Sequence, residues 1–318
     1  MKIHFWGTRG SIPIAITAQD IRAKLAYALA RSVGRDLSSA VHIDHYLDSL
    51  PFDASATFGG NTSCVTLEAD AAEPIILDLG SGARSMGLYM LSRFGATTPL
   101  TYHVFMSHFH WDHIMGFPFF TPAYIPGNHI IIHSCHDEVE SAFRKQHAEP
   151  FFPVNFKQLG ARIEFDLMQP GAIYQIGGYE VRAKKQLHVG DSYGWRFERA
   201  GKILVYSTDS EHKLEKAGEV DSFVEFFRNA DLVIFDAMFS LAEAISAKAD
   251  WGHSSNIVGI ELCQLARARR LALFHHEPAS SDAQISEMLA ESRRFEEITR
   301  SEHPVEVIAA WDGLEMTL

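Results

Sequence analysis

Short apolar runs bounded by turn residues recur along the whole chain and predict β-strands. Residues 2–6 alternate polar and apolar side chains before a glycine-containing turn at 7–11, so Ile3 and Phe5 are expected to face a core. Residues 102–106 are apolar enough for a buried strand. Further strands are predicted, in chain order, at about 64–67, 74–78, 130–133, 163–165, 179–187, 194–197, 203–208, 230–235, 271–274 and 305–310.

Segments with helical spacing of their apolar residues alternate with these strands, at about 18–33, 42–50, 83–94, 256–268 and 282–299. In the first, Ile21, Leu25 and Leu29 share one side and the charged residues lie mostly elsewhere, which predicts an amphipathic surface helix. Its charges are interpreted as simply solvated, with a lid or a substrate cover as the alternative. Since no Gly/Ser-rich linker divides the chain, residues 1–318 are predicted to form one α/β domain made of two β-rich halves.

Composition narrows the functional classes. The formal net charge of −12 argues against broad, non-specific adhesion to nucleic acid, but it leaves room for a local basic pocket. The start of the chain is too short and too polar for a signal peptide, and no membrane-spanning run is found. Cys64, Cys135 and Cys263 are widely spaced in apolar surroundings and are interpreted as small buried side chains, so a reducing cytoplasm is the expected location.

The densest polar signal is segment 107–116, where His108, His110, Asp112 and His113 fall within six consecutive positions. Divalent cations such as zinc bind imidazole nitrogens and carboxylate oxygens at about 2.0–2.2 Å, so ligands from one short segment must project toward a common point. His108 and His110 share a side of an extended chain, and Asp112 begins a predicted short helix. Scattered histidines, of which the chain has 17, are the alternative, but four potential ligands in so short a segment favour a metal site.

Three more candidate ligands lie where predicted strands end. His188 follows one strand, Asp209 ends the strand at 203–208, and His275 ends the strand at 271–274. Each alone is typical of a turn residue or of a histidine with an ordinary hydrogen bond, but together they supply the extra ligands that two metal ions need. His276 directly follows His275, so the residues leave open which of the two is the last ligand.

Two further residues are candidates for supporting roles. Asp78 ends a strand before glycines that permit close backbone approach, so it is expected to orient a neighbouring loop rather than bind metal, with a turn-capping aspartate as the alternative. Ser254 or Ser255 suits the N-cap of the helix at 256–268, which leaves His253 without a structural explanation. Five other histidines have no spacing that ties them to the site and are interpreted as structural: His103, His129, His133, His136 and His147.

The pattern His-x-His-x-Asp-His at 108–113 resembles the signature of the metallo-β-lactamase fold superfamily. The order of the other motifs is most similar to its ribonuclease Z and phosphodiesterase branch; these motifs are 7–11, 61–63, 77–82, 194–196, 207–209, 252–255 and 274–275. The resemblance spans nearly the whole chain except a helical insertion at about 14–57. It implies a four-layer αββα sandwich with a metal site at one edge of its two sheets.

The resemblance also implies two divalent metal ions, zinc first, with manganese or iron as alternatives. The implied ligands are His108, His110 and His188 for the first ion, Asp112, His113 and His275 for the second, and Asp209 as the bridge. His275 is preferred to His276 because it directly ends the strand. His253 matches a histidine that stabilises or protonates the departing phosphate oxygen, and Asp112 is expected to accept a proton from water while also binding metal.

The function implied is that of a metal-dependent hydrolase, with a phosphodiesterase acting on a small phosphodiester or a cyclic nucleotide as the favoured form. Ribonuclease Z enzymes carry a Gly- and Pro-rich arm that grips transfer RNA, and no such arm is visible here. A tRNA-processing type of endoribonuclease is therefore an alternative, and nucleic acid is not the favoured partner. A mononuclear iron oxidoreductase of the same fold is a second alternative, although the complete second ligand set argues against it. The insertion at 14–57 is a candidate lid or homodimer element.

Overall fold

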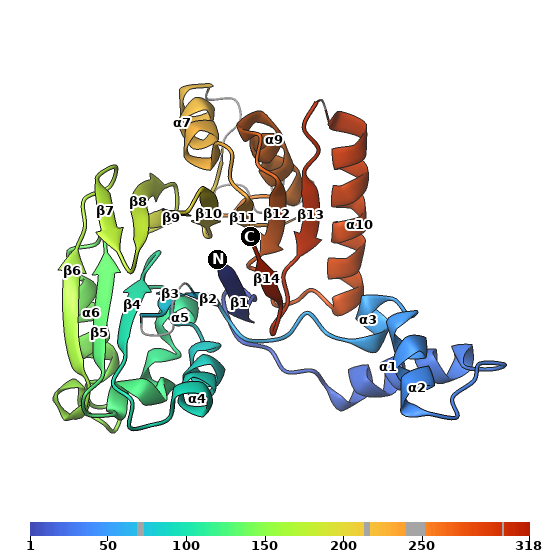
Figure 1. Ribbon diagram of the computed structural model, residues 1–318, viewed down its shortest axis with the longest axis horizontal. Helices are drawn as coiled ribbons and strands as arrows, with labels where there is room; N and C mark the ends of the chain where they lie inside the picture. Colours follow the sequence, from blue (N-terminus) through green and yellow to red (C-terminus); the bar gives the residue numbers. More distant parts are fainter. Residues whose placement is uncertain (69–72, 213–216, 240–251, 301) are drawn as a thin grey trace.

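The computed structural model of the chain consists of two mixed β-sheets with helices against their outer faces (Figure 1). It describes residues 1–68, 73–212, 217–239, 252–300 and 302–318. The first sheet has the strand order β14 (Glu315–Thr317), β1 (Lys2–Gly7), β2 (Cys64–Glu68), β3 (Ile75–Leu77), β4 (Thr101–Phe105), β5 (His129–Ser134) and β6 (Arg162–Leu167). The second has the order β13 (Glu306–Ala309), β12 (Arg270–Phe274), β11 (Leu232–Asp236), β10 (Lys202–Ser207), β9 (Ser192–Arg199), β8 (Tyr179–Gln186) and β7 (Ile173–Ile176).

Buried apolar clusters explain why the layers stack. Strand β4 contributes to two of them, because successive side chains of a strand point to opposite faces. Phe105 packs between the two sheets with Trp195, while Val104 lies in the cluster on the outer face of the first sheet, under helix α4 (Ala83–Phe94). A third cluster joins the outer face of the second sheet to α9 (Asn256–Ala266). The predicted αββα sandwich is therefore confirmed.

Most predicted elements lie within a few residues of their expected bounds. The remaining helices of the sandwich are α5 (Trp111–Ile114), α6 (Val139–Gln146), α7 (Ala217–Phe227) and α10 (Asp282–Thr299). The sequence analysis missed β7, β14, α6 and α7; the two strands are only four and three residues long, too short for a period to stand out. Helix α7 did carry a signal, with Val220, Phe223, Val224 and Phe227 at helical spacing. Among the described residues, no helix is long and apolar enough to cross a bilayer.

Parallel strand pairing brings distant polar residues to one edge of the sandwich. Strands β3 and β4 are parallel in the first sheet, and β10, β11 and β12 are parallel in the second. The carboxyl ends of parallel strands lie on the same side of a sheet, so the residues just after them become neighbours. Asp78, Ser107, Asp209, Asp236 and His275 all come at or directly after these ends.

Helices α1 (Ala18–Arg31), α2 (Ala40–Asp48) and α3 (Phe52–Ser55) belong to a segment, residues 12–57, that extends away from the two sheets and is called the arm below (Figure 1). Helix α1 begins with a capping box formed by Thr17 and Asp20. The arm returns to the first sheet through the loop that precedes β2.

The orientation of α1 corrects one prediction in part: Arg22 and Arg31 are exposed as expected, but Lys24 is not simply solvated. Lys24 points toward the body: its Nζ donates to the carbonyl oxygens of Asp53 and of Ala56, the latter at 2.8 Å, and lies 2.8 Å from the carboxylate of Asp282. No residue of α1 is buried, and its apolar side chains face solvent. The cause is electrostatic. The Lys24 ammonium pairs with the carboxylate at the start of α10 and donates to two carbonyl oxygens at and just after α3, so this side of α1 faces the body.

Candidate metal centre

Asp78 fixes the loop that follows β4. Its carboxylate accepts hydrogen bonds from the backbone N–H and the hydroxyl of Ser107, both at 2.7 Å, and from the hydroxyl of Tyr206 in the second sheet at 2.8 Å. It also lies 2.8 Å from Nδ1 of His113, so this nitrogen carries the proton and Nε2 presents its lone pair to the site. Asp78 thus orients the neighbouring loop, in agreement with the prediction.

A first group of candidate ligands consists of His108, His110, His188 and Asp209, each with one ligand atom within 4.8 Å of all the others. Nε2 of His188 lies 3.1 Å from Nδ1 of His110. Oδ2 of Asp209 lies 3.6 Å from Nε2 of His108 and 3.7 Å from Nε2 of His188. Nδ1 of His188 donates to the Gly252 carbonyl at 2.8 Å, which leaves Nε2 free to bind a cation.

A second group consists of Asp112, His113, Asp209 and His275. Oδ2 of Asp112 lies 3.2 Å from Nε2 of His113 and 3.1 Å from Nε2 of His275. Oδ1 of Asp209 lies 3.2 Å and 3.3 Å from the same two nitrogens. Asp209 therefore belongs to both groups and directs one oxygen to each, which is the arrangement of a carboxylate between two cations.

The chemistry of both groups fits divalent cations. Nε2 of His108 is buried and has no hydrogen-bond partner among the residues that the structure describes, although a buried nitrogen normally has one. The Nε2 atoms of His113 and His275 lie only 3.4 Å apart. Neutral imidazoles and carboxylates are ligands that zinc, manganese and iron all accept. The structure brings together all seven residues predicted as ligands, and their assignment as ligands stays a prediction.

The buried histidines and carboxylates of the two groups shift one another's pKa values. Burial lowers the pKa of His108 well below its usual range, and the neighbouring His113 lowers it further, so His108 is neutral and able to bind metal. Burial by itself would raise the pKa of Asp209, but His275 and His113 hold that pKa well below its usual value. The same contacts act on His113, because burial by itself would lower its pKa, but Asp209 and Asp112 raise it.

Three site residues have a left-handed backbone that non-glycine residues rarely adopt: φ is 56° at Asp78, 48° at Asp209 and 59° at His275. Each lies within two residues of the end of a strand. Such a conformation costs on the order of 1–3 kcal/mol and persists only where the surroundings enforce it. Here it turns each side chain back over the edge of the sandwich, toward the other ligands.

His253 lies beside the second group and is paired with Asp236. Nδ1 of His253 lies 2.8 Å from Oδ2 of Asp236, and its ring stacks on that of His275 with 5.2 Å between ring centroids. Burial by itself would lower the pKa of His253, but the fully buried Asp236 outweighs it, and the pKa rises to about 9. Asp236, His253 and His275 are also close enough to hold an ion, but a protonated His253 has no lone pair left with which to bind one.

Two points about this edge were beyond the sequence analysis. Asp236 was recognised only as a strand end, although β11 lies between the strands that supply Asp209 and His275, which is the signal that could have found it. The structure also separates the two neighbouring histidines. His275 joins the second group, whereas Nε2 of His276 lies 2.8 Å from the carbonyl oxygen of Ala310.

The histidines that were predicted to be structural lie outside both ligand groups. Nδ1 of His103 lies 3.0 Å from Nε2 of His133, whose Nδ1 lies 2.8 Å from the carboxylate of Asp166. Burial, followed by the nearby His133, lowers the pKa of His103 to about 4. His103 is therefore neutral at neutral pH, and both histidines have protein partners, in contrast to Nε2 of His108.

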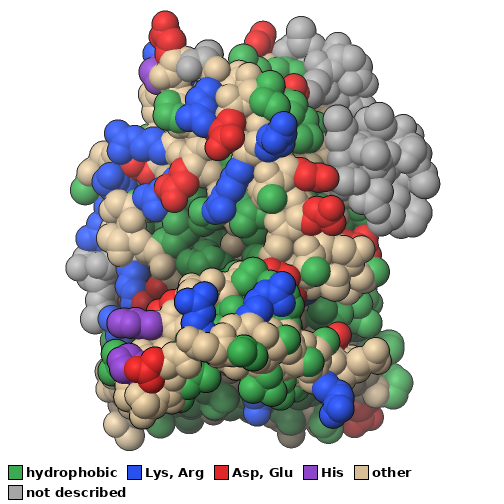
Figure 2. Space-filling view, turned by 90° about the vertical axis from the view of Figure 1, so that its right-hand side faces the viewer, with side chains coloured by type: hydrophobic (Ala, Val, Ile, Leu, Met, Phe, Trp, Pro, Cys, Tyr) green, Lys and Arg blue, Asp and Glu red, His purple; other side chains and the backbone are tan. Residues whose placement is uncertain are grey.

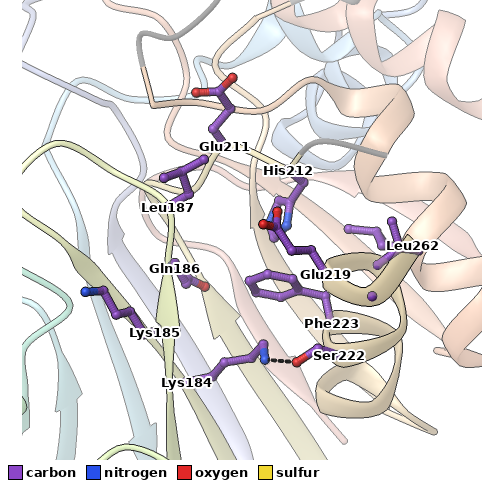
Figure 3. Close-up of a pocket in the computed structure, with 12 residues that line it drawn as sticks. Lys184, Lys185, Gln186, Leu187, Glu211, His212, Glu219, Ser222, Phe223 and Leu262 are labelled. Carbon is purple, nitrogen blue, oxygen red and sulfur yellow. Dashed lines mark hydrogen bonds between the residues drawn. The ribbon is translucent and has the colours of Figure 1, made fainter. Parts of the chain in front are cut away.

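A cavity of about 420 Å³ opens between the end of β8 and α7 (Figure 3). Leu187 on its rim directly precedes His188, and His212 on its wall follows Asp209 by three residues. None of the seven predicted ligands lines this cavity, but His188 and Asp209 are close in sequence to residues that do. Phe223 from α7 faces it opposite β8 (Figure 3).

The walls of this cavity combine aromatic and polar groups. The ring of His212 packs against those of Phe223 and Phe235, with 4.3 Å and 5.2 Å between centroids. Nε2 of His212 is buried and has no hydrogen-bond partner in the described part of the chain. Lys184 donates to the hydroxyl of Ser222, and its Nζ lies 4.6 Å from the centroid of the Phe223 ring (Figure 3).

Comparison with known proteins identifies the family. Residues 91–276, more than half of the chain, match the family model described as the beta-lactamase superfamily domain. The chain belongs to this superfamily. Ribonuclease Z of Pyrococcus furiosus is 23% identical over 256 residues, which cover 66% of this chain and 79% of that protein.

Solved structures of superfamily members show the same fold. The metallo-beta-lactamase fold protein YhfI from Bacillus subtilis superposes with a TM-score of 0.63 at 19% identity, over 99% of this chain and 98% of that chain. A diphosphatase from the PhnP family superposes with a TM-score of 0.61 at 17% identity, over 100% of this chain and 97% of that chain. The predicted metallo-β-lactamase fold, in its ribonuclease Z and phosphodiesterase-like branch, is confirmed. The protein is a metal-dependent hydrolase, and its fold implies divalent metal ions that the two His/Asp groups fit.

Proposed function

We propose that this protein is a phosphodiesterase that uses two divalent metal ions, zinc by preference, to hydrolyse a small phosphodiester or a cyclic nucleotide. The observation that carries the proposal is a pair of ligand groups that share Asp209 and lie beside the His253–Asp236 pair. When bound, two such ions lower the pKa of water from about 15.7 toward 7 and neutralise charge on the phosphoryl oxygens.

The residues of the chain that would hold the ions fall into two sets with one shared member. They are His108, His110 and His188 for the first ion, Asp112, His113 and His275 for the second, and Asp209 for both. Asp112 accepts a proton from the attacking water, since its Oδ2 faces the second group and the N–H of Ser11 holds that oxygen at 2.7 Å.

His253 supplies the proton that the departing oxygen needs. Asp236 holds Nδ1, so the opposite nitrogen, Nε2, is the one available to donate to substrate. A general acid of this kind contributes roughly a hundredfold to ten-thousandfold in rate. Asp236 touches neither substrate nor metal in this proposal; it positions His253 and keeps it protonated.

The cavity beside His188 supports a small substrate. Its volume of about 420 Å³ falls in the range of about 300–1,000 Å³ that is typical of small-molecule sites. Phe223 offers an aromatic surface for a base or an aryl group, and Lys184 and Ser222 offer polar atoms at its far end. In this proposal, the substituent of a phosphodiester held at the ligand groups extends past Leu187 toward this cavity.

The test is a side-by-side assay of the purified, metal-loaded protein on a bis-aryl phosphate, cyclic nucleotides and precursor transfer RNA. We expect turnover of the small diesters, and Phe223→Ala should raise KM for the aryl and cyclic nucleotide substrates about tenfold because it removes a stacking surface. Phe151→Ala, which alters an exposed aromatic side chain elsewhere, is the matched control. Efficient cleavage of precursor transfer RNA alone would contradict the proposal.

Two other functions can be tested beside this one. The similarity to Pyrococcus furiosus ribonuclease Z favours a tRNA-processing endoribonuclease as the second candidate. One redox-active iron per chain, measured by metal analysis, would instead favour the mononuclear oxidoreductase. The proposal treats residues 1–318 as one domain with the arm as an insertion.

A further inference from the structure

The two ligand groups reach the protein surface at His110. Six of the seven predicted ligands are buried, whereas His110 is exposed. The rings of His110 and His188 lie 4.9 Å apart between centroids, so the chain neighbours of these two histidines border the opening. A substrate that enters past the described residues therefore meets these neighbours first.

Apolar side chains lie around this opening. Trp111 follows His110 and is 62% exposed, while Leu187 and Val189 flank His188 and are 47% and 68% exposed. Figure 3 shows Leu187 beside the cavity, just past the end of β8. Within the described part of the chain, the indole of Trp111 makes no hydrogen bond and no contact with another ring. Exposed apolar side chains that gather at one place, unlike single ones scattered over a surface, indicate a binding site.

From this arrangement we infer that Trp111 is a specificity-determining residue, whose indole stacks on an aromatic ester group of the phosphodiester substrate. The inference rests on the proposed function and narrows the substrate class to diesters that keep such an aromatic ester group on phosphorus after cleavage. An indole offers a broad apolar face to an aromatic ring while only two side-chain torsions become ordered.

A phosphodiester has two ester groups, and the two sheets provide a place for each. The ring of His253 lies 5.1 Å from that of His188 between centroids, and His188 directly follows Leu187. The ester group whose oxygen receives the proton of His253 is therefore the one near Leu187 and the cavity, on the side of the second sheet. Trp111 lies in the segment after β4 of the first sheet, which leaves it for the ester group that stays on phosphorus.

The charges near the opening favour an apolar group over a long polyanion. Lys185, two residues before Leu187, lies 2.7 Å from the carboxylate of Asp191 and is paired. On the face shown in Figure 2, the Lys and Arg side chains of the described residues lie among Asp and Glu side chains. A nucleic-acid strand needs a face rich in cations, whereas an aromatic ester group needs only an apolar contact.

The first test keeps the leaving group constant and changes the ester group that stays. Bis(p-nitrophenyl) phosphate and methyl p-nitrophenyl phosphate both release p-nitrophenolate, but only the first keeps an aryl group. In the full-length, metal-loaded protein, Trp111→Ala should raise KM about tenfold for the first diester and less than about twofold for the second, because it removes a stacking surface. Trp111→Phe keeps an aromatic ring and should stay within about twofold of the wild type on both.

Controls separate this contact from the ligand groups beside it. The metal content of both Trp111 variants, measured by mass spectrometry, should equal that of the wild type. Phe151→Ala, which alters another strongly exposed aromatic side chain, should leave both KM values unchanged. An equal rise of KM on both diesters, or no rise on either, would overturn the inference. A wild type that hydrolyses no diester would instead contradict the proposed function, and binding without turnover then decides on the contact.

Diphenylphosphinate reports on binding without turnover, since its two aryl groups are joined to phosphorus through carbon. Trp111 is the most exposed of the tryptophans that the structure describes, so we expect this anion to change the tryptophan fluorescence of the wild type, whereas dimethylphosphinate should not. Trp111→Phe should still bind diphenylphosphinate by calorimetry but lose the fluorescence change. A change that persists in this variant, or wild-type binding without one, would overturn the inference. Flotation of the wild type with anionic vesicles that Trp111→Ala abolishes would assign Trp111 to a membrane and overturn it as well.

Discussion

The edge of the sandwich that carries the two ligand groups, called the ligand edge here, and the arm distribute polar and apolar side chains in opposite ways. Both depart from the ordinary pattern of apolar side chains inside and charged side chains outside. At the edge, Asp209 and His108 are each 2% exposed, which places ionisable groups where hydrocarbon normally lies. On the arm, Leu29 is 67% exposed, which leaves hydrocarbon where charge normally lies. Buried charge is stable only beside a compensating charge, and a large exposed apolar surface is stable in solution mainly when something covers it.

The comparison teaches that a local departure from the usual pattern can indicate a missing component. For the ligand edge, the fold implies divalent metal ions that the two His/Asp groups fit; on the arm, the aliphatic side chains of α1 stay exposed among the residues that the structure describes. The two departures differ in their internal support. Asp78 and Asp236 hold the histidines of the edge through hydrogen bonds, whereas α1 is held by Lys24 and by the hydroxyl of Tyr46, which donates to the carbonyl oxygen of Ala28.

Removing the shared carboxylate should have the largest effect. Asp209→Ala deletes the only one of the predicted ligands that belongs to both groups. We expect both metal ions to be lost or weakly held and turnover to fall by roughly a thousandfold or more. Metal content by mass spectrometry and initial rates on a bis-aryl phosphate measure this. Asp221→Ala, at an exposed position of α7, is the control and should change neither.

The His253 variant separates catalysis from metal binding at the same edge. His253→Ala should reduce kcat by about a hundredfold, because it removes the proton donor while leaving the seven predicted ligands in place. Metal content should stay unchanged. Asp236→Asn should act in the same direction with a smaller effect, since the histidine ring remains. Loss of metal in the His253 variant would give this residue a structural role and contradict the proposed one.

His103 is a buried histidine away from the ligand edge and serves as a comparison with His108. Its Nδ1 has a protein partner, His133, whereas Nε2 of His108 has no hydrogen-bond partner among the described residues. The pKa of His103 is about 4 in the folded protein and about 6.5 when unfolded, so the unfolded chain takes up the proton first as pH falls. This contribution to stability is complete above about pH 6.5 and is lost as pH falls toward 4. We expect about 3 kcal/mol of stability to disappear across that window.

Denaturant unfolding at a series of pH values, with His103→Gln as the comparison at equal metal loading, measures the His103 effect. The variant should lose stability less steeply between pH 6.5 and 4 than the wild type does. Identical slopes for the two proteins would show that His103 does not titrate as expected.

The smallest expected effect concerns the attachment of the arm. Lys24→Met keeps the length of the side chain but leaves the carboxylate of Asp282 and the carbonyl of Ala56 without this donor. We expect a loss of about 1–2 kcal/mol in the stability of the arm, seen as faster amide hydrogen exchange in α1. Arg22→Met on the same helix is the matched control and should exchange at the wild-type rate.

The sequence by itself determined the elements and the chemistry that depends on neighbours in the chain. Strand and helix periods follow from local sterics and burial, so most elements could be placed to within a few residues. The cluster His108, His110, Asp112 and His113 is dense enough to indicate a metal site without any fold.

Only the tertiary structure decided what depends on residues far apart. His113 and His275 are 162 positions apart, yet their nitrogens lie 3.4 Å from each other, and this contact distinguishes His275 from His276. The pairing of Asp236 with His253 also depends on residues that are distant in the sequence. The same holds for the outward orientation of Leu25 and Leu29 on α1, where Lys24 contacts Asp282. The physical reason is that a sequence pattern shows which faces and side chains a segment offers, while packing decides which of them are buried, paired or left exposed.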